Sequence, residues 1–333
     1  MLKKILKFFD TRTAKRILAR EKINPEKGIA AIKIVLTSMF FSKNISYVIS
    51  ELKTRENLRT FLKIEEVPEK TMLYRFLSRI EEKSFVNVIL RILNKQCRKR
   101  RRGRASIIVD STDVQLDINY FRRRIKKEDL EDKEFKWGYS PSKGYYVGYK
   151  LTVAIDQRSL MPLAFLLHEG SPNDAKLFYQ ILKELKKRRV IREGDVLIAD
   201  KGYYSYKNYL KGITRFRIVP LIFPRKNFNL SRALGLFSYP LDVFCSNSLR
   251  KDVFIKLARK FRKMILRWER YRSIRSRMED LFKLAKNAFS LDRLHRYTKK
   301  SVKKFVGLNV LLLGMVVSMG IRRKEELHRL VYM

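Results

Sequence analysis

Three carboxylate residues, Asp110, Asp200 and Glu279, have the sequence surroundings of a metal-dependent reaction centre. Asp110 ends a short apolar run, and Asp200 ends another. Such runs indicate buried strands, and the carboxyl ends of strands in open α/β sheets border ligand crevices. Carboxylate oxygens bind Mg²⁺, and two ions about 3.5–4 Å apart stabilise the attacking and leaving oxygens of a phosphoryl displacement. We therefore predict two Mg²⁺ ions, with Mn²⁺ as a substitute, although each aspartate alone is also consistent with a cap or turn.

Glu279 lies in a basic stretch that we expect to be helical from residue 268 to 288. At about 100° per residue, Arg272, Arg275 and Lys286 lie within about 40° of Glu279 on one face of this helix. A separate apolar stripe is formed by Ile274, Met278, Leu281, Ala285 and Ala288. Glu279 is therefore expected among cations and away from the main core contact, although a solvated surface of ion pairs would give the same pattern.

The charge of the chain is the strongest compositional signal. Lys and Arg number 76 against 33 Asp and Glu, a formal net charge of +43. This imbalance indicates a polyanionic partner, whose binding should weaken with salt, and makes an ordinary soluble enzyme a poor fit. A merely solvated basic surface is the alternative.

The remaining composition favours a cytoplasmic, nucleoid-associated protein. Cys97 and Cys245 provide neither a disulfide framework nor metal-ligand spacing, and the basic N-terminus has no apolar run long enough for a signal peptide. Residues 305–321 are apolar but shorter than the roughly 20 residues of a membrane span. We expect a buried core helix there and no membrane partner, with a membrane anchor as the alternative.

Two regions are expected along the chain. Residues 1–100 read as helices and are predicted to form a helical DNA-binding domain, with a bare helical scaffold as the alternative. The basic run 98–104 marks a boundary. Residues 105–325 then read as an α/β domain, a mixed sheet flanked by helices. Its strands are expected at 105–110, 147–156, 160–168, 195–200 and 216–223, its helices at 175–189, 203–212 and 268–288, and a loop at 224–250.

The sequence resembles insertion-sequence DDE transposases over roughly residues 30–320. Arg275-x₃-Glu279-x₆-Lys286 is similar to the family pattern Tyr-x₂-Arg-x₃-Glu-x₆-Lys. Further similar segments, in order, are Val67–Phe76, Ile108–Thr112, Gly148–Lys150, Gly170–Asp174 and Ala199–Tyr203. The resemblance implies an RNase H-like catalytic domain in which Asp110, Asp200 and Glu279 are the catalytic and metal-binding triad. It also implies cleavage at transposon ends and strand transfer into target DNA.

The resemblance further implies that Arg275 and Lys286 contact DNA phosphates near the transposon end. The family tyrosine corresponds to Arg272 here, and Tyr271 lies one residue early. We expect Arg272 to replace the tyrosine electrostatically, while the DNA contact of Tyr271 is put in question. Lys201 and Tyr203 directly follow Asp200 and are expected to position DNA.

The implied partners are double-stranded DNA, both terminal inverted repeats and target, and a second copy of the chain that holds the other end. A nuclease without strand transfer and a non-catalytic DNA-binding protein, such as a decayed copy, remain alternatives, and a basic RNA-binding protein is more distant. Aromatics interleaved with Lys136, Lys143 and Lys150 suit stacking on an unpaired base, or are half-buried strand residues. These aromatics are Trp137, Tyr139, Tyr145, Tyr146 and Tyr149.

Overall fold

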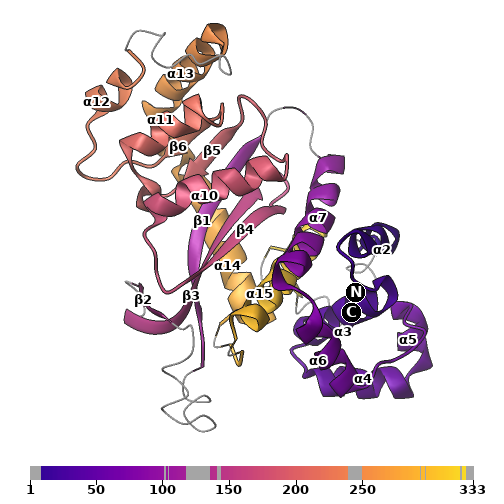
Figure 1. Cartoon of the computed structure of the whole chain (residues 1–333). Coiled ribbons are helices and arrows are strands. Elements are labelled where there is room, and N and C mark those ends of the chain that lie inside the picture. The colour runs from indigo at the N-terminus through magenta and orange to yellow at the C-terminus, as the bar shows by residue number, and fades with distance from the viewer. Residues whose placement is uncertain are drawn as a thin grey trace.

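The computed structural model describes residues 9–100, 103, 105–117, 136–140, 144–238, 250–292, 294–296, 298–322 and 325–327. The basic run at 122–127, Lys143 and Cys245 lie outside the described residues. Helices form the first part of the chain, as predicted (Figure 1). They are α2 Thr11–Arg20, α3 Pro25–Phe40, α4 Ile45–Thr54, α5 Glu56–Leu62, α6 Lys70–Arg79 and α7 Glu82–Arg100.

Local sequence signals start several of these helices. The side chains of Asp10, Asn24 and Asn44 accept hydrogen bonds from the backbone three residues later and so cap α2, α3 and α4. Pro25 occupies the first turn of α3, where its missing N–H costs no hydrogen bond. The helical prediction is therefore confirmed for the described residues 9–100, while the DNA-binding role of this region stays a prediction.

A six-stranded mixed sheet follows, which confirms the predicted fold class. Its order is β2-β3-β1-β5-β6, and β4 pairs with β3 off this path, on the side of β3 opposite β1. The β1–β5 and β5–β6 pairs are parallel, and the pairs that β3 makes with β1, β2 and β4 are antiparallel. The strands are β1 Ser106–Gln115, β2 Lys136–Ser140, β3 Gly144–Asp156, β4 Pro162–Glu169, β5 Val196–Ala199 and β6 Val219–Ile222.

The first strand is longer than the sequence indicates. The prediction that Asp110 ends a strand is wrong, because residues 111–115 continue β1 by pairing with residues 148–152 of β3. Gly148 permits this register: a Cβ there would lie 2.2 Å from the Val114 carbonyl oxygen, which no other residue tolerates. Asp200, in contrast, directly follows β5 as predicted.

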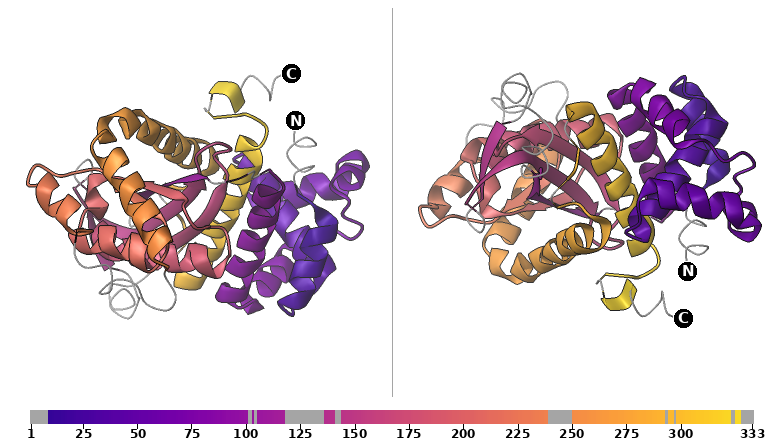
Figure 2. Two further views of the ribbon diagram at one scale, coloured as in Figure 1. Left: turned by 90° about the horizontal axis from the view of Figure 1, so that it is seen from above. Right: turned by 90° about the horizontal axis from the view of Figure 1, so that it is seen from below.

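Helices cover both faces of the sheet, with α10 Asp174–Lys187 in front and α14 Ser276–Phe289 behind in Figure 1, and Figure 2 shows the same layers from above and below. Helix α11 Tyr206–Thr214 and helix α13 Lys251–Ile265 pack against β6. The expected loop at 224–250 contains α12 Leu230–Gly235, and the sequence reading also missed α13.

The last long helix, α15 Lys299–Val317, joins the helical region to the sheet. It packs against α3, α7, β4 and α14, and nearly all its residues from Val306 onward are buried. Gly314 allows a close approach, since a Cβ there would lie 2.5 Å from Leu93 of α7. The predicted buried core helix is confirmed. No single helix in the described residues is long and apolar enough to cross a membrane. Helices α3 and α4 taken together have the length and composition of a span, but the chain bends by 111° between them.

Candidate active site

The sheet topology places Asp110 beside Asp200. Strands β1 and β5 run parallel and adjacent, with Val109 opposite Ala199, so the two aspartates are the next residues in register. Neighbouring strands lie about 4.8 Å apart, which brings the two carboxylates to one edge of the sheet. Both side chains are largely buried, with 14 % and 18 % of their surface exposed. Glu279 reaches the same place from α14 and is half-exposed.

Arg275, at the start of α14, contacts all three carboxylates. Its Nη1 donates a hydrogen bond to Asp200 Oδ1 over 3.1 Å. Its Nε lies 3.4 Å from Glu279 Oε1 and 3.9 Å from Asp110 Oδ2. One guanidinium therefore stands as the common countercharge of three acidic side chains that come from three separate elements.

The three carboxylates suit divalent cations by their donor chemistry. Mg²⁺ prefers a small number of hard carboxylate oxygens, and such a set surrounds Arg275. Arg275 Nε is buried without a hydrogen bond, so its charge only partly satisfies these oxygens. Within the described residues, no group of three or more acidic, His or Cys side chains is already arranged to hold a metal.

Burial raises the pKa of Asp110 to about 7, and the neighbouring Asp200 and Asp174 carboxylates raise it as well. The backbone N–H of Ser111, which donates to Asp110 Oδ1 over 2.8 Å, and the charge of Arg275 act in the opposite direction. The folded protein therefore holds a proton on Asp110 more tightly than the unfolded chain does.

This pKa predicts a pH-dependent gain in stability for Asp110→Asn in the absence of metal. Because the folded pKa of about 7 exceeds the ordinary 3.8, the stabilising effect of protonation is complete below about pH 4 and lost as the pH rises through 7. Thermal unfolding with a chelator should show wild type weakening relative to Asp110→Asn between pH 4 and 7. Asp252→Asn, at an exposed aspartate of α13, is the control; a stability difference independent of pH would contradict the assignment.

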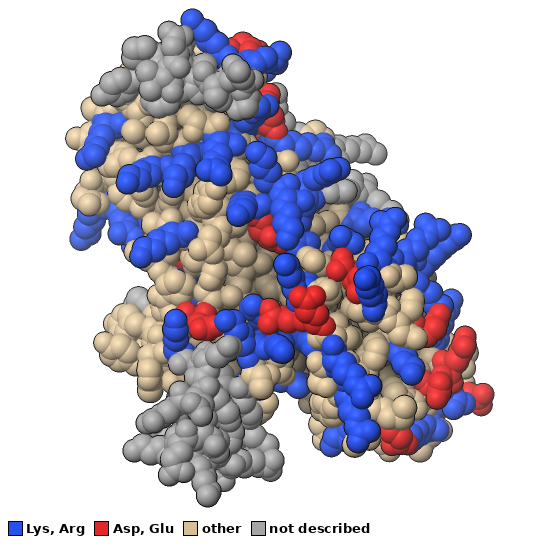
Figure 3. Space-filling view, viewed as in Figure 1, with Lys and Arg blue, Asp and Glu red and all other residues tan. Residues whose placement is uncertain are grey.

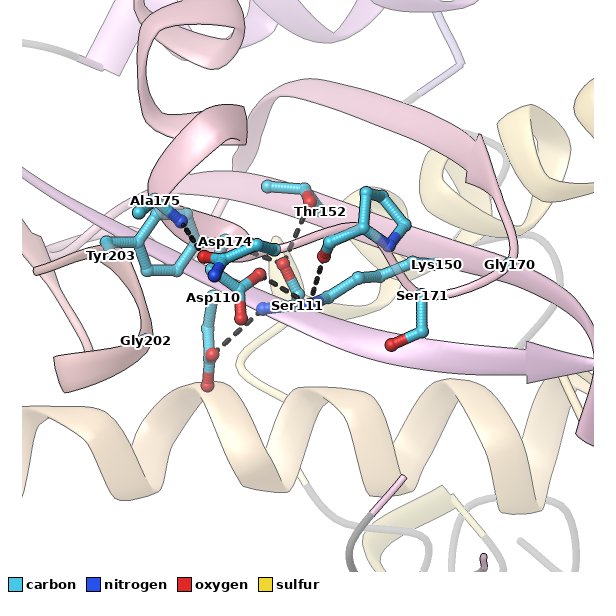
Figure 4. Close-up of polar contacts among 12 residues, drawn as sticks. Asp110, Ser111, Lys150, Thr152, Gly170, Ser171, Asp174, Ala175, Gly202 and Tyr203 are labelled. Carbon is cyan, nitrogen blue, oxygen red and sulfur yellow. Dashed lines mark hydrogen bonds and ion pairs between the residues drawn. The ribbon is translucent and has the colours of Figure 1, made fainter. Parts of the chain in front are cut away.

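Hydrogen bonds fix the strand around Asp110. Ser111 Oγ bonds both Thr152 Oγ1 of β3 at 2.8 Å and the Tyr203 hydroxyl at 2.6 Å (Figure 4). Tyr203 belongs to the short 3₁₀ helix η1, Lys201–Tyr203, and only 1 % of its surface is exposed. A buried hydroxyl offers no surface to DNA, so the environment of Tyr203 differs from that expected of a DNA contact. The neighbouring Lys201 is exposed, as a DNA contact requires.

A second ion pair, between Lys150 and Asp174, lies directly behind the site and brings three of the sequence motifs together. Lys150 Nζ lies 2.7 Å from Asp174 Oδ1 and donates to the Pro172 carbonyl over 3.0 Å (Figure 4). Gly202 passes close to this pair, since a Cβ there would lie 2.8 Å from Asp174 Oδ2. The motifs ending at Lys150, Asp174 and Tyr203 thus meet at one place, and the sequence reading did not include Lys150 or Asp174 in the site.

The segment before Glu279 departs from the expected single helix over 268–288. Residues Trp268–Arg275 form a 3₁₀ helix, η3, and α14 begins only at Ser276. A 3₁₀ helix has three residues per turn, which shifts the directions expected for residues before Arg275. The packing of Trp268 against Phe223, with ring centroids 5.7 Å apart, anchors this segment at the sheet. Tyr271 consequently packs against the core, and Arg272 is exposed.

Lys286 lies two turns after Glu279 and forms an ion pair with Asp113 of β1 over 2.9 Å. Both side chains are largely buried, so Lys286 neutralises Asp113 in this conformation. Together with Arg275, this pair fixes α14 along β1.

Fold and site together define a protein with acidic residues gathered on a mixed sheet and on one neighbouring helix. The chain belongs to the DDE transposase family, since the model of the Transposase DDE domain matches residues 79–315. No curated protein matches the sequence. A solved structure, described as the piggyBac transposase synaptic complex with hairpin DNA, is similar with a TM-score of 0.45 and 11 % identity, over 93 % of this chain and 70 % of that one.

Proposed function

We propose that this member of the DNA transposase family cleaves DNA at transposon ends with divalent metal ions and transfers the freed strand into target DNA. The observation that carries the proposal is the contact of Arg275 with Asp110, Asp200 and Glu279. The basic charge of the chain supports a DNA substrate. The DNA is expected to be double-stranded, comprising terminal inverted repeats and target, and two copies of the chain would hold the two ends.

Asp110, Asp200 and Glu279 would hold the metal ions, two Mg²⁺ with Mn²⁺ as a substitute. Bound between carboxylates, such ions stabilise the attacking and leaving oxygens of an in-line phosphoryl displacement. The two aspartates are fixed by β1, β5 and the Ser111–Tyr203 bond, so their oxygens are oriented before DNA arrives. Glu279 is half-exposed and can complete the ligand set from α14.

Several cations are placed to bind phosphates beside this site. Arg275 is 40 % exposed, and a guanidinium released from the carboxylates can bind a phosphate oxygen. Arg272 and Lys201 are exposed on the neighbouring segments, and Arg225 Nε donates to the Lys201 carbonyl, which steadies that turn. Lys and Arg cover much of the face in Figure 3, over the helical region as well as the sheet region. We infer that residues 1–100 bind DNA and 105–325 form the catalytic domain.

The proposal is tested with linear DNA that carries the inverted repeats flanking the gene. Purified protein is incubated with this DNA, target plasmid and Mg²⁺ or Mn²⁺, and products are resolved by strand on denaturing gels. We expect metal-dependent cuts at the repeat ends followed by joining of the 3′ ends to target. Scrambled repeats of equal length are the control.

Two results would replace the proposal by an alternative. Cleaved ends without joined products, across metals and salt concentrations, would indicate a nuclease. A shift in DNA mobility that is identical with and without metal, and never followed by cleavage, would indicate a DNA-binding protein without chemistry.

A further inference from the structure

A two-stranded ribbon projects from the sheet beyond its neighbours. Strand β2 pairs with residues 144–148 of β3, whereas β1 pairs with β3 only from Gly148 onward and β4 only from Tyr149 onward. Among the described residues, the backbone of Val147 still accepts a hydrogen bond from Leu116, so residues 144–146 are the part of β3 that pairs with β2 alone. Figure 1 shows this ribbon at the lower left, where β2 and the start of β3 extend past the other strands.

One face of the ribbon carries three exposed aromatic side chains. Trp137 pairs with Val147 and Tyr139 with Tyr145, so strand alternation places these residues on a common face. Trp137 is 65 % exposed, Tyr139 54 % and Tyr145 78 %. The rings of Tyr139 and Tyr145 lie 5.3 Å apart at 61°, in edge contact. The aromatic platform, as we call Trp137, Tyr139 and Tyr145, thus presents large apolar rings to solvent.

The opposite face of the ribbon serves the fold. Tyr146 is buried and lies over Gly138, where a Cβ would come within 2.6 Å of its ring. Its hydroxyl donates a 3.5 Å hydrogen bond to the Gly170 carbonyl. Packing therefore accounts for Tyr146 and Gly138, but it does not account for three rings that turn away from the core.

We propose that the aromatic platform binds unpaired nucleotides of the DNA substrate by stacking their bases. This inference deepens the proposed function and rests on it. Bases stack on aromatic rings without sequence preference, and cations beside the rings hold the phosphates. The cation nearest to the rings in sequence, Lys136, begins β2 on the opposite face, where its Nζ lies 4.0 Å from Glu169 Oε2 and its side chain remains 72 % exposed. The charge of +43 favours a polyanion over a protein partner on this face.

The sheet also sets the distance of the platform from the carboxylates. Tyr145 and Val153 lie on β3, eight residues apart, and Val153 pairs with Asp110. At about 3.3 Å per residue, the platform is at most about 26 Å from Asp110 along the strand. One DNA strand advances about 3.4 Å per nucleotide, so stacked bases would lie up to about eight nucleotides from the reacting bond.

The test measures binding of a 12-nucleotide oligo-dT with one central 2-aminopurine, in the presence of a chelator so that no cleavage occurs. We expect Trp137→Ala, Tyr139→Ala and Tyr145→Ala each to weaken binding by about 5- to 150-fold, the equivalent of about 1–3 kcal/mol per stacked base. The fluorescence change of 2-aminopurine should fall in parallel. Trp137→Phe should retain binding, because a phenyl ring still stacks.

Leu266→Ala is the control, since Leu266 is a 52 % exposed apolar side chain directly after α13, outside both the ribbon and residues 1–100. Unchanged oligo-dT binding in all three platform variants would overturn the proposal. So would a change confined to self-association in sedimentation experiments, which would make the platform a contact between copies. Asp200→Asn protein should bind oligo-dT like wild type, so a loss of cleavage is distinguishable from a loss of stacking.

Discussion

Asp200→Asn is expected to lower the rate of metal-dependent cleavage of repeat-end DNA by at least about 10³-fold. Asp200 lies beside Asp110 in the parallel register of β1 and β5 and contributes a charged oxygen to the proposed cation site. Metal ions contribute several kcal/mol of transition-state stabilisation, and about 4 kcal/mol corresponds to a factor of 10³. An amide retains the size of the side chain but loses the charge that binds a cation. Single-turnover cleavage on labelled DNA measures the effect.

The fold and DNA binding should survive this substitution. Asp200 lies at the edge of the sheet with 18 % of its side chain exposed, and its contact is the Arg275 guanidinium, to which an amide oxygen can also accept. Circular dichroism and DNA binding in chelator should therefore match wild type. Glu279→Gln should behave similarly, and Glu269→Gln on the exposed part of η3 is its control. Cleavage by Asp200→Asn at a near-normal rate would contradict the proposed catalytic role of the three carboxylates.

The sequence predicted those parts of the site that depend on local patterns. The run Val196–Ala199 is apolar and buried, and Asp200 follows it directly. Both the predicted strand and the predicted place of Asp200 at its end therefore agree with the structure. Glu279 was expected beside Arg275 because the two residues are one helical turn apart. The long apolar run in α15 was long enough to indicate a helix and too short to indicate a membrane span.

The missed parts depend on pairing between distant segments. Residues 111–115 are mostly polar, and they form a strand because β3 supplies hydrogen-bonding partners about 35 residues later in the chain. No local pattern contains this information. For the same reason the sequence does not predict the ion pair between Lys150 and Asp174, which joins β3 to the first turn of α10.

Helix α13 was missed although its sequence carried the signal. Its buried residues Val253, Phe254, Leu257, Phe261, Met264 and Ile265 follow a helical period over four turns. The helix supplies 15 of the 78 residues between Asp200 and Glu279 and packs against β6.

The sequence correctly predicts that Arg275 lies near Glu279, but it predicts only part of the contacts of Arg275. A helical projection sets it near Glu279, yet cannot show that the same guanidinium also contacts Asp110 and Asp200 across the sheet edge. A cation competing for the same oxygens must displace it. The arginine and the metal ions are therefore expected to be linked thermodynamically, each weakening the binding of the other.

Arg275→Gln is accordingly expected to bind Mn²⁺ more tightly than wild type and yet to cleave DNA more slowly. Ion pairs of a half-exposed arginine contribute roughly 0.2–1 kcal/mol each, and three at once give a gain in Mn²⁺ affinity of about 3- to 150-fold. Cleavage should fall by about 10- to 100-fold, because the same guanidinium no longer binds a DNA phosphate. Calorimetric titration of chelator-treated protein measures the affinity, and single-turnover assays measure the rate.

The opposite signs of the two effects make this variant diagnostic. Without metal, Arg275→Gln should also unfold at a lower temperature at pH 8, since three carboxylates lose their common countercharge, and added Mn²⁺ should recover much of that loss. Arg277→Gln is the matched control, because Arg277 lies two residues away on α14, is exposed and, within the described part of the chain, makes a single polar contact, of 3.5 Å, with the Gln157 carbonyl. Weaker Mn²⁺ binding in Arg275→Gln would show that the arginine supports the cation site instead of competing for it. In that case the carboxylates would bind metal without displacing Arg275, and the conformation described would already be the metal-binding one.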